Sequence, residues 1–339
     1  MALPSSGSIS LSQVNVELDL TATASINMGS AAVRGLFDIA SGAISMSDGY
    51  GKANAFAFTQ TIASSVQNYN LRTAMIAAGY AGSGAFTANI TINSGVYVWT
   101  NTTATAGFDT GALSGGTINI TNNGFIIGKG GNGSGVNNSA GNPGGPAMSI
   151  SHNVTMTNNS YIAGGGGSGG QRSGGGGAGG GNGGAGDRPT RAGGVGGAIG
   201  ASGANGSPAS GGGGPPQVSF GAGAGGGRIL PGSGGAAGNA NGSTPTGGGA
   251  GGGGGAYIRS GFYGPGNVDA TAVGGSGGSA GNNGGGAQTT ESGGGGGGGG
   301  WGASGGTSKY APGAGGKAIA LNGNSITFNA TGTRYGATS

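Results

Sequence analysis

The residues of this sequence that could carry out acid–base, nucleophilic or metal chemistry are few and widely spaced. The only histidine is His152, cysteine is absent, and the eight aspartates and glutamates are scattered over 339 residues. A catalytic triad or a metal site requires several such groups within bonding distance of one another. We therefore predict no catalytic residue, no bound metal, no cofactor and no enzyme activity.

Phosphate-bearing and membrane partners are also unexpected. The segment GFIIGKG at 124–130 is one residue shorter than a phosphate-binding loop and has Gly130 where that loop requires Ser or Thr, so it predicts a turn. The formal net charge is only +4, without clusters of lysine and arginine. No run of about 18 apolar residues is present. We predict no nucleic-acid binding and no membrane insertion.

The strongest chemical signal is a group of aromatic and basic side chains in the segment AYIRSGFYGPG at 256–266. Tyr257, Arg259, Phe262 and Tyr263 follow directly on a run of glycine and alanine. Tyrosine and arginine are enriched among the residues that carry most of the energy of protein binding. The segment therefore predicts a binding surface, and the adjacent glycines must position it.

Glycine dominates the second half of the chain. Of 96 glycines, 70 lie between residues 164 and 316. Collagen is excluded because the glycines follow no strict period of three and proline totals only 11. A flexible linker is the other common form of a glycine-rich segment, but here aromatic residues interrupt the runs and charged residues make up only 6% of the chain.

An ordered glycine-rich segment can form a bundle of extended helices. A polyglycine helix of the polyproline-II type has three residues per turn and no internal hydrogen bonds, so its backbone groups point sideways. Neighbouring helices can satisfy those groups because no side chain lies between them. We predict that 164–316 forms parallel and antiparallel helices of this kind, with almost no conventional helix or strand and with its turns at the non-glycine interruptions.

Two further units precede this segment, and a short one follows it. Residues 1–55 predict a small helical cap, in which Ser10 or Ser12 caps the first helix. Residues 56–163 alternate apolar and polar residues and predict a β-solenoid or sandwich, with one helix at 70–80. A repeat at an offset of 36 aligns Ile118 with Val154 and Phe125 with Tyr161. Residues 317–339 predict a strand that returns to this β-domain.

Two resemblances to known families point to a virus particle. The stretches SLSQVNVELDL, AAVRGLFDI and GAISMSDGYGK resemble an N-terminal module of bacteriophage virion proteins. The long glycine runs, with GGGGGGGGWGASGG and GGKAIALNGNSITF, resemble the tail fibre tip adhesins of T-even-like phages. The resemblance implies an adhesin at the tip of a tail fibre or baseplate that binds a bacterial outer-membrane protein or surface glycan and docks to another fibre or baseplate protein through residues 1–55.

The predicted turns suggest which residues meet the receptor. If successive helices run up and down, odd-numbered turns lie at one end, and even-numbered turns, including Phe220, lie at the other, beside the β-domain. The odd end collects the basic and aromatic candidates for receptor binding: Arg172, Arg228, Ile229, Leu230, Tyr257, Arg259, Phe262, Tyr263, Lys309 and Tyr310. Trp301 is expected to fill a small core at an end of the bundle.

The virion-docking candidates are the apolar residues Leu11, Val14 and Leu18 of the first helix, which we expect to be exposed. Two alternatives to an adhesin remain at this point. A non-adhesive structural virion protein would share the same modules. An ice-binding protein can also use a bundle of glycine helices, although that use favours strict tripeptide repeats, which this sequence lacks.

Overall fold

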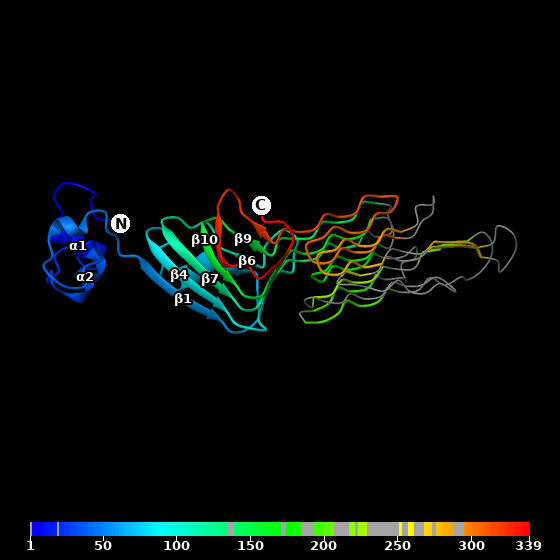
Figure 1. The fold of residues 1–339 in the computed structure, drawn as a ribbon, viewed down its shortest axis with the longest axis horizontal. Helices are drawn as coiled ribbons and strands as arrows, with labels where there is room; N and C mark the ends of the chain where they lie inside the picture. Colours follow the sequence, from blue (N-terminus) through cyan, green and yellow to red (C-terminus); the bar gives the residue numbers. More distant parts are fainter. Residues whose placement is uncertain are drawn as a thin grey trace.

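The computed structural model describes most of the chain. The described residues are 2–18, 20–133, 139–170, 174–184, 193–198, 200–206, 217–220, 223–228, 251–252, 257–260, 268–272, 276–287 and 295–339. For 217–220, 257–260 and 268–272 only the backbone is described. The N-terminal module, the β-domain and the glycine-rich segment follow one another along the long axis of the molecule, and residues 317–339 return to the β-domain (Figure 1).

The N-terminal module is helical, as the sequence predicts. It contains α1 (Leu11–Glu17), α2 (Ala31–Phe37) and the short 3-10 helix η1 (Met46–Gly49). Ser10 caps α1: its hydroxyl accepts a hydrogen bond from the Gln13 amide, and the Gln13 side chain accepts one from the Ser10 amide. This reciprocal pair satisfies two amides at the helix start. The prediction that Ser10 or Ser12 caps this helix is confirmed for Ser10.

The β-domain is built from three parallel sheets. The first sheet contains β1 (Phe56–Ile62), β4 (Phe86–Ile92), β7 (Gly116–Asn122), β10 (Val154–Asn158) and β16 (Ile326–Ala330). The second sheet contains β2 (Val66–Gln67), β5 (Tyr97–Trp99), β8 (Phe125–Ile127), β11 (Tyr161–Ala163) and β17 (Thr333–Tyr335). The third sheet contains β3 (Tyr69–Asn70), β6 (Phe108–Asp109), β9 (Met148–Ser149) and β15 (Ile319–Ala320). Each of the first four coils of chain adds one strand to each sheet in turn, and the fifth adds β16 and β17 to the first two sheets. The stacked coils form a β-solenoid.

Strand register follows the sequence repeat. Val154 pairs with Ile118 and Tyr161 with Phe125, which confirms the alignment at an offset of 36. Inward-facing residues of successive coils therefore meet in columns, such as Ile90, Ile120 and Met156, all of which are buried. The predicted helix at 70–80 is α3 (Leu71–Ala77), which packs Leu71 and Met75 into the same core.

The glycine-rich segment is an excursion from one corner of the solenoid. This corner joins the second sheet to the third, and its length differs between coils: β2 to β3 leaves only residue 68, β5 to β6 leaves 100–107, β8 to β9 leaves 128–147, and β11 to β15 leaves 164–318. β16 then pairs with β10 in the next coil. The solenoid thus holds both ends of the excursion in one coil, at β11 in the second sheet and at β15 in the third.

Backbone hydrogen bonds join the glycine-rich stretches laterally. In 175–179, successive amides bond to different neighbours, and amides three residues apart bond to the same neighbour: Gly175 and Ala178 donate to Gly296 and Gly299, Gly176 and Gly179 to Ala224 and Gly227, and Gly177 to Gly131. Residues 165–169 show the same period, with Gly165 and Ser168 donating to Gly145 and Asn142. The stretch 128–147 from the preceding coil joins this network.

The turns beside the solenoid consist mainly of glycine. Backbone φ is positive at Gly179, Gly180, Gly200, Gly281 and Gly302, a conformation that glycine adopts without strain. These turns lie inside or beside glycine runs, so a search for non-glycine interruptions overlooks them. The prediction that every turn is an interruption, and with it the odd and even assignment of turns to two ends, is therefore wrong.

Three short strands are the one conventional element among the described residues of 164–316. β12 (Gln217–Phe220), β13 (Tyr257–Ser260) and β14 (Val268–Ala272) form an antiparallel sheet at the end of the molecule opposite the N-terminal module (Figure 1). All three fall in interruptions that contain β-branched or aromatic residues, which favour strands over polyproline-II geometry.

The close lateral packing makes a testable prediction about glycine. A Cβ atom at Gly169 would overlap the carbonyl oxygen of Gly296. Because both groups are backbone, neither can move aside cheaply, so Gly169→Ala should destabilise the protein by about 1–3 kcal/mol. The matched control is Gly35→Ala in α2, where a Cβ meets nothing within 4 Å. Thermal unfolding of both variants tests this, and equal melting temperatures would contradict it.

Candidate functional site

The end of the glycine-rich segment nearest the solenoid is sealed by an aromatic cluster. Trp301 is fully buried there with Ile127 and Ala163 of the solenoid and Ala178 of a glycine turn. Around them pack the half-buried side chains Tyr97, Trp99, Phe125, Tyr161, Ala280 and Tyr335. The prediction that Trp301 fills a small core is confirmed. This core fixes the segment to the solenoid.

Arg228 belongs to this junction and not to a receptor-binding tip. Its side chain is only 8% exposed, its Nε donates to the Gly179 carbonyl at 3.0 Å, and its guanidinium lies 4.7 Å from the centre of the Trp99 ring. Lys129 donates to the next carbonyl, that of Gly180. The two cations thus hold both carbonyls of one tight turn against the solenoid. The sequence assigned Arg228 to the other end because it counted turns by interruptions.

At the opposite end, backbone pairing brings Tyr257 and Arg259 together with the segment that contains Phe220. Tyr257 pairs with Phe220 and Ala272, and Arg259 pairs with Val218. The sequence placed Phe220 beside the β-domain, at the end opposite Tyr257. That placement is wrong because β12 and β13 are neighbours in one sheet.

The remaining receptor-binding candidates divide into two groups. Lys309 is exposed and Tyr310 is half-buried, on a turn whose end, Ala311, accepts a hydrogen bond from Gly141. The other candidates lie outside the described residues: Arg172, Ile229, Leu230, Phe262 and Tyr263. The side chains of Tyr257 and Arg259 are likewise not described, so only the backbone of β13 places them.

A comparison with protein families identifies the chain. The model of a family described as phage tail fibre adhesin Gp38 matches residues 57–232, more than half of the sequence. This chain belongs to that family. It is therefore a receptor-binding adhesin of a phage tail fibre, and the family assignment favours this function over a non-adhesive structural protein or an ice-binding protein.

One solved structure is similar to the adhesin over most of its length. It is the crystal structure of the gp37-gp38 adhesin tip complex of the bacteriophage S16 long tail fiber, with a TM-score of 0.44, 18% sequence identity and coverage of 91% of each chain. No curated protein sequence matches this chain.

The N-terminal module of the adhesin carries an apolar surface that differs from the predicted one. Val14 is fully buried and Leu18 is half-buried against the module's core, so only Leu11 is exposed as expected. Exposed side chains that the sequence analysis missed are Val16, Leu20 and Tyr50. A hollow of about 340 Å³ lies beside Val16, lined by Ala2, Leu3, Pro4, Ser12, Gln13, Val16, Glu17 and Ala22.

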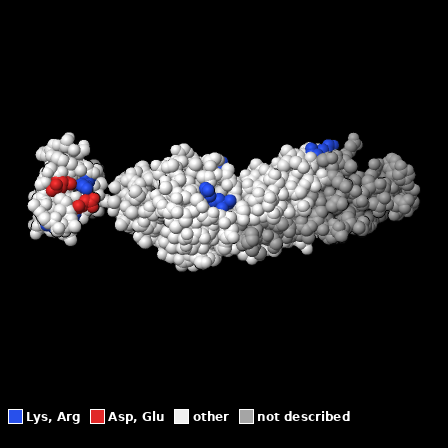
Figure 2. Space-filling view, viewed as in Figure 1, with Lys and Arg blue, Asp and Glu red and all other residues white. Residues whose placement is uncertain are grey.

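Charge is confined to a few places on the described surface. Figure 2 shows acidic side chains on the N-terminal module, whereas the visible described face of the solenoid and glycine-rich segment shows only isolated basic ones. Among the described residues, no group of three or more His, Cys, Asp or Glu side chains could hold a metal ion. None of the described helices has the length and apolar character needed to cross a bilayer.

Replacing Trp301 tests the junction. Trp301→Ala should leave a large cavity between the solenoid and the glycine turns and cost about 3–5 kcal/mol of stability. Thermal unfolding should show the loss, and limited proteolysis should show earlier cleavage in the glycine-rich segment than in the solenoid. Uniform resistance to protease, equal to that of the unmodified adhesin, would contradict a role for Trp301 in fixing the segment.

The junction lysine makes a prediction about pH. Burial, aided by the charge of Arg228, lowers the pKa of Lys129 from 10.5 to about 8. Between these two values the unfolded chain binds a proton that the folded chain does not, so folding becomes more favourable as pH rises. The melting temperature of the adhesin, relative to that of Lys129→Met, should therefore increase between about pH 8 and about pH 10. A difference that stays constant or decreases would contradict the assignment.

Proposed function

We propose that the adhesin contacts its bacterial receptor at the end of the molecule where β12, β13 and β14 lie. The backbone of β13 carries this proposal, because it places Tyr257 and Arg259 at the end opposite the N-terminal module (Figure 1). Phe262 and Tyr263 follow β13 in the sequence, before β14 begins. Aromatic residues with an intervening arginine have the composition of binding hot spots.

We further propose that the glycine-rich stretches are polyglycine-II helices, which form the shaft that carries this end. The support is the hydrogen-bond period of three in 165–169 and 175–179. A helix with three residues per turn directs amides i and i+3 to the same neighbour, whereas an α-helix bonds within itself and a strand alternates between two sides. A shaft of this kind has no side chains to vary, so variation falls on its ends.

The receptor in this proposal is a loop of an outer-membrane protein or a surface glycan. Phe220, Val218 and Ile258 join Tyr257 in the same small sheet, and Arg259 adds a positive charge. Arginine forms paired hydrogen bonds with carboxylates, and tyrosine provides apolar area with a polar edge. The adhesin acts in this scheme by binding alone, without catalysis.

The tip makes the first functional prediction. The triple variant Tyr257→Ala, Phe262→Ala and Tyr263→Ala should lose at least tenfold in adsorption of phage particles to host cells. Melting temperature and incorporation into virions should be unchanged. The matched control is Asn89→Ala with Asn119→Ala, two exposed solenoid side chains that bond to each other, and it should adsorb normally. Equal adsorption by both variants would refute the proposal.

Host cells stripped of either receptor class distinguish the two candidates. Protease treatment of the cells should abolish adsorption if the receptor is a protein loop, and periodate oxidation should abolish it if the receptor is a glycan. In each case the triple variant should resemble the unmodified adhesin on treated cells. A tip variant that still responds to the treatment would show that another surface contacts the receptor.

We propose that residues 1–55 attach the adhesin to another tail fibre or baseplate protein. The module lies at the end opposite β13; Leu11, Val16 and Leu20 are each about 45% exposed, and Val16 lines its apolar hollow. Removal of residues 1–55 should leave a folded protein that still binds cells but no longer joins particles. Val16→Asp alone should weaken incorporation, since it places a charge beside the hollow. Normal incorporation of both variants would contradict docking by this module.

A further inference from the structure

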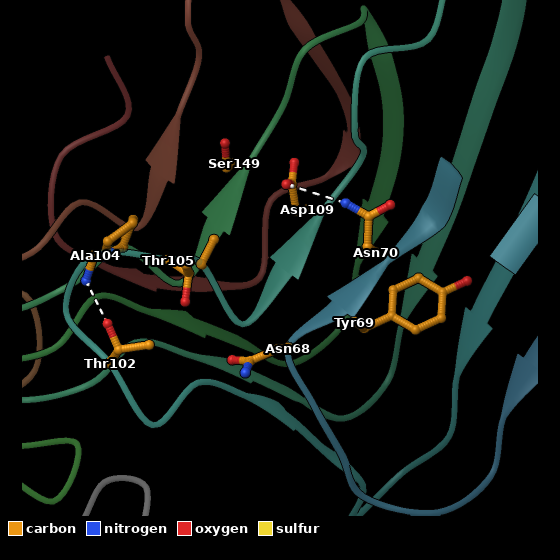
Figure 3. Close-up of a pocket in the computed structure, with 10 residues that line it drawn as sticks. Asn68, Tyr69, Asn70, Thr102, Ala104, Thr105, Asp109 and Ser149 are labelled. Atoms are coloured by element: carbon orange, nitrogen blue, oxygen red, sulfur yellow. Dashed lines mark hydrogen bonds between the residues drawn. The ribbon is translucent and has the colours of Figure 1, made fainter. Parts of the chain in front are cut away.

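A polar hollow lies on the third sheet of the solenoid, remote from both the tip and the N-terminal module. Its volume is about 380 Å³, within the range of small-molecule sites. Ten residues line it: Asn68, Tyr69, Asn70, Thr102, Ala104, Thr105, Ala106, Asp109, Pro146 and Ser149. They come from three successive coils, so the hollow is a product of the solenoid's stacking and not of a single loop (Figure 3).

The floor of the hollow is a row of polar side chains fixed by strand register. Asn70, Asp109 and Ser149 are paired across β3, β6 and β9, so they project from the same face of the sheet. Asn70 donates from Nδ2 to Asp109 Oδ2 at 3.3 Å, and Ser149 Oγ accepts from Asn322 at 3.1 Å. Figure 3 shows the three side chains in a line. An amide, a carboxylate and a hydroxyl thus stand in a row along one edge of the hollow.

The wall is supplied by the short excursion of the second coil. Thr100 and Thr105 share a hydroxyl hydrogen bond of 3.0 Å, and Thr102 Oγ1 accepts from the Ala104 amide at 2.9 Å. These bonds hold residues 100–107 in place over the sheet. Ala104, Ala106 and Pro146 add apolar area among the hydroxyl and amide groups. A site with both polar groups and apolar carbon atoms suits a ligand that has both polar groups and apolar surface.

Asp109 is the one carboxylate that the structure describes outside the N-terminal module. Its Oδ1 accepts from the Gly111 amide at 2.9 Å, and its Oδ2 accepts from Asn70. A carboxylate has about four acceptor positions, so about two remain for a ligand. Asn70 is itself oriented, because its Oδ1 accepts from the Thr73 amide at the start of α3. The two carboxylate oxygens of Asp109 are therefore held in position to accept hydrogen bonds from hydroxyl groups of a ligand.

A metal cation fits this arrangement poorly. Calcium takes six to eight oxygen ligands, commonly from several carboxylates. Here Asp109 has no second carboxylate beside it among the described residues, and both of its oxygens accept from N–H donors, those of Gly111 and Asn70. An anion is excluded by the charge of Asp109, and no cationic side chain lines the hollow. A neutral molecule rich in hydroxyl groups matches both the acceptors and the apolar wall.

We propose that this hollow is a second binding site of the adhesin, which holds one sugar ring of a neutral glycan. Asp109 accepts hydrogen bonds from adjacent hydroxyls of the ring, the Asn70 and Ser149 side chains border them, and the C–H face of the ring lies on Ala104, Ala106 and Pro146. The site is shallow and contacts one ring, so its affinity is millimolar. It adds a weak contact with surface glycan, independent of the receptor contact at the tip.

Saturation-transfer NMR with the full-length adhesin tests the site. The probes are free glucose, galactose, mannose and N-acetylglucosamine, each at millimolar concentration. At least one sugar should receive magnetisation from the protein. Asp109→Asn should weaken that binding at least tenfold, because the amide keeps the shape and one acceptor but replaces the other with a donor. Its melting temperature should fall by no more than a few degrees, because the change removes one hydrogen bond, that from Asn70 to Asp109.

The matched control is Asp38→Asn in the N-terminal module. It makes the same change of charge at an exposed residue whose φ of 63° suits asparagine. Sugar binding should be unaffected by it, and also by the triple tip variant, so that failure of this site and failure of the tip are distinguished. Absence of transfer to all four sugars, or transfer that persists in Asp109→Asn, would overturn the proposal.

Discussion

The glycine-rich part of this adhesin depends on lateral hydrogen bonding between backbones that carry no side chains. Each stretch bonds to three neighbours in turn, so no amide in 175–179 lacks a partner. This arrangement requires the chains to approach so closely that a Cβ at many positions would overlap a neighbouring carbonyl oxygen. Glycine is therefore required by packing, even though ordering glycine costs more conformational entropy than ordering any other residue.

The solenoid offsets part of that entropic cost by holding the ends of the excursion. β11 and β15 belong to the same coil, and β16 and β17 close the next coil over them. The stretch 128–147 of the preceding coil lies alongside, so the first glycine-rich stretches begin against backbone already fixed by sheet pairing. Trp301 and Arg228 then fasten the glycine turns to the second sheet. Order in the segment thus propagates outward from the solenoid.

Much of the fold is predictable from the sequence because side chains determine it locally. Alternation and the repeat at an offset of 36 predict the strands and their register, and Ser10 and residues 70–80 predict a cap and a helix. The direction of the glycine stretches is not predictable in this way. A glycine turn such as 179–180 has the same composition as the run that contains it, so the sequence carries no signal for it.

The same limit explains which site residues were misplaced. Arg228 ends a glycine run and was assigned to a tip, yet it reaches back to Trp99, a contact that spans more than a hundred residues of sequence. Val14 was assigned to a docking surface from its apolar character alone, although an amphipathic helix buries one face and exposes the other. Pairing of β12 with β13 likewise joins interruptions that the sequence separates by long glycine runs.

The juxtaposition of glycine runs and bulky segments follows from these constraints. Where backbones bond laterally at short range, larger side chains find little room, so the interior of the shaft cannot hold a receptor-specific surface. The end nearest the solenoid is occupied by the aromatic cluster around Trp301 and by the cations that hold the turn at 179–180. At the opposite end, the segments of β12, β13 and β14 carry aromatic residues away from this junction. The chain therefore has glycine where backbones must bond laterally at short range, and its bulkiest residues where contact with another molecule is possible.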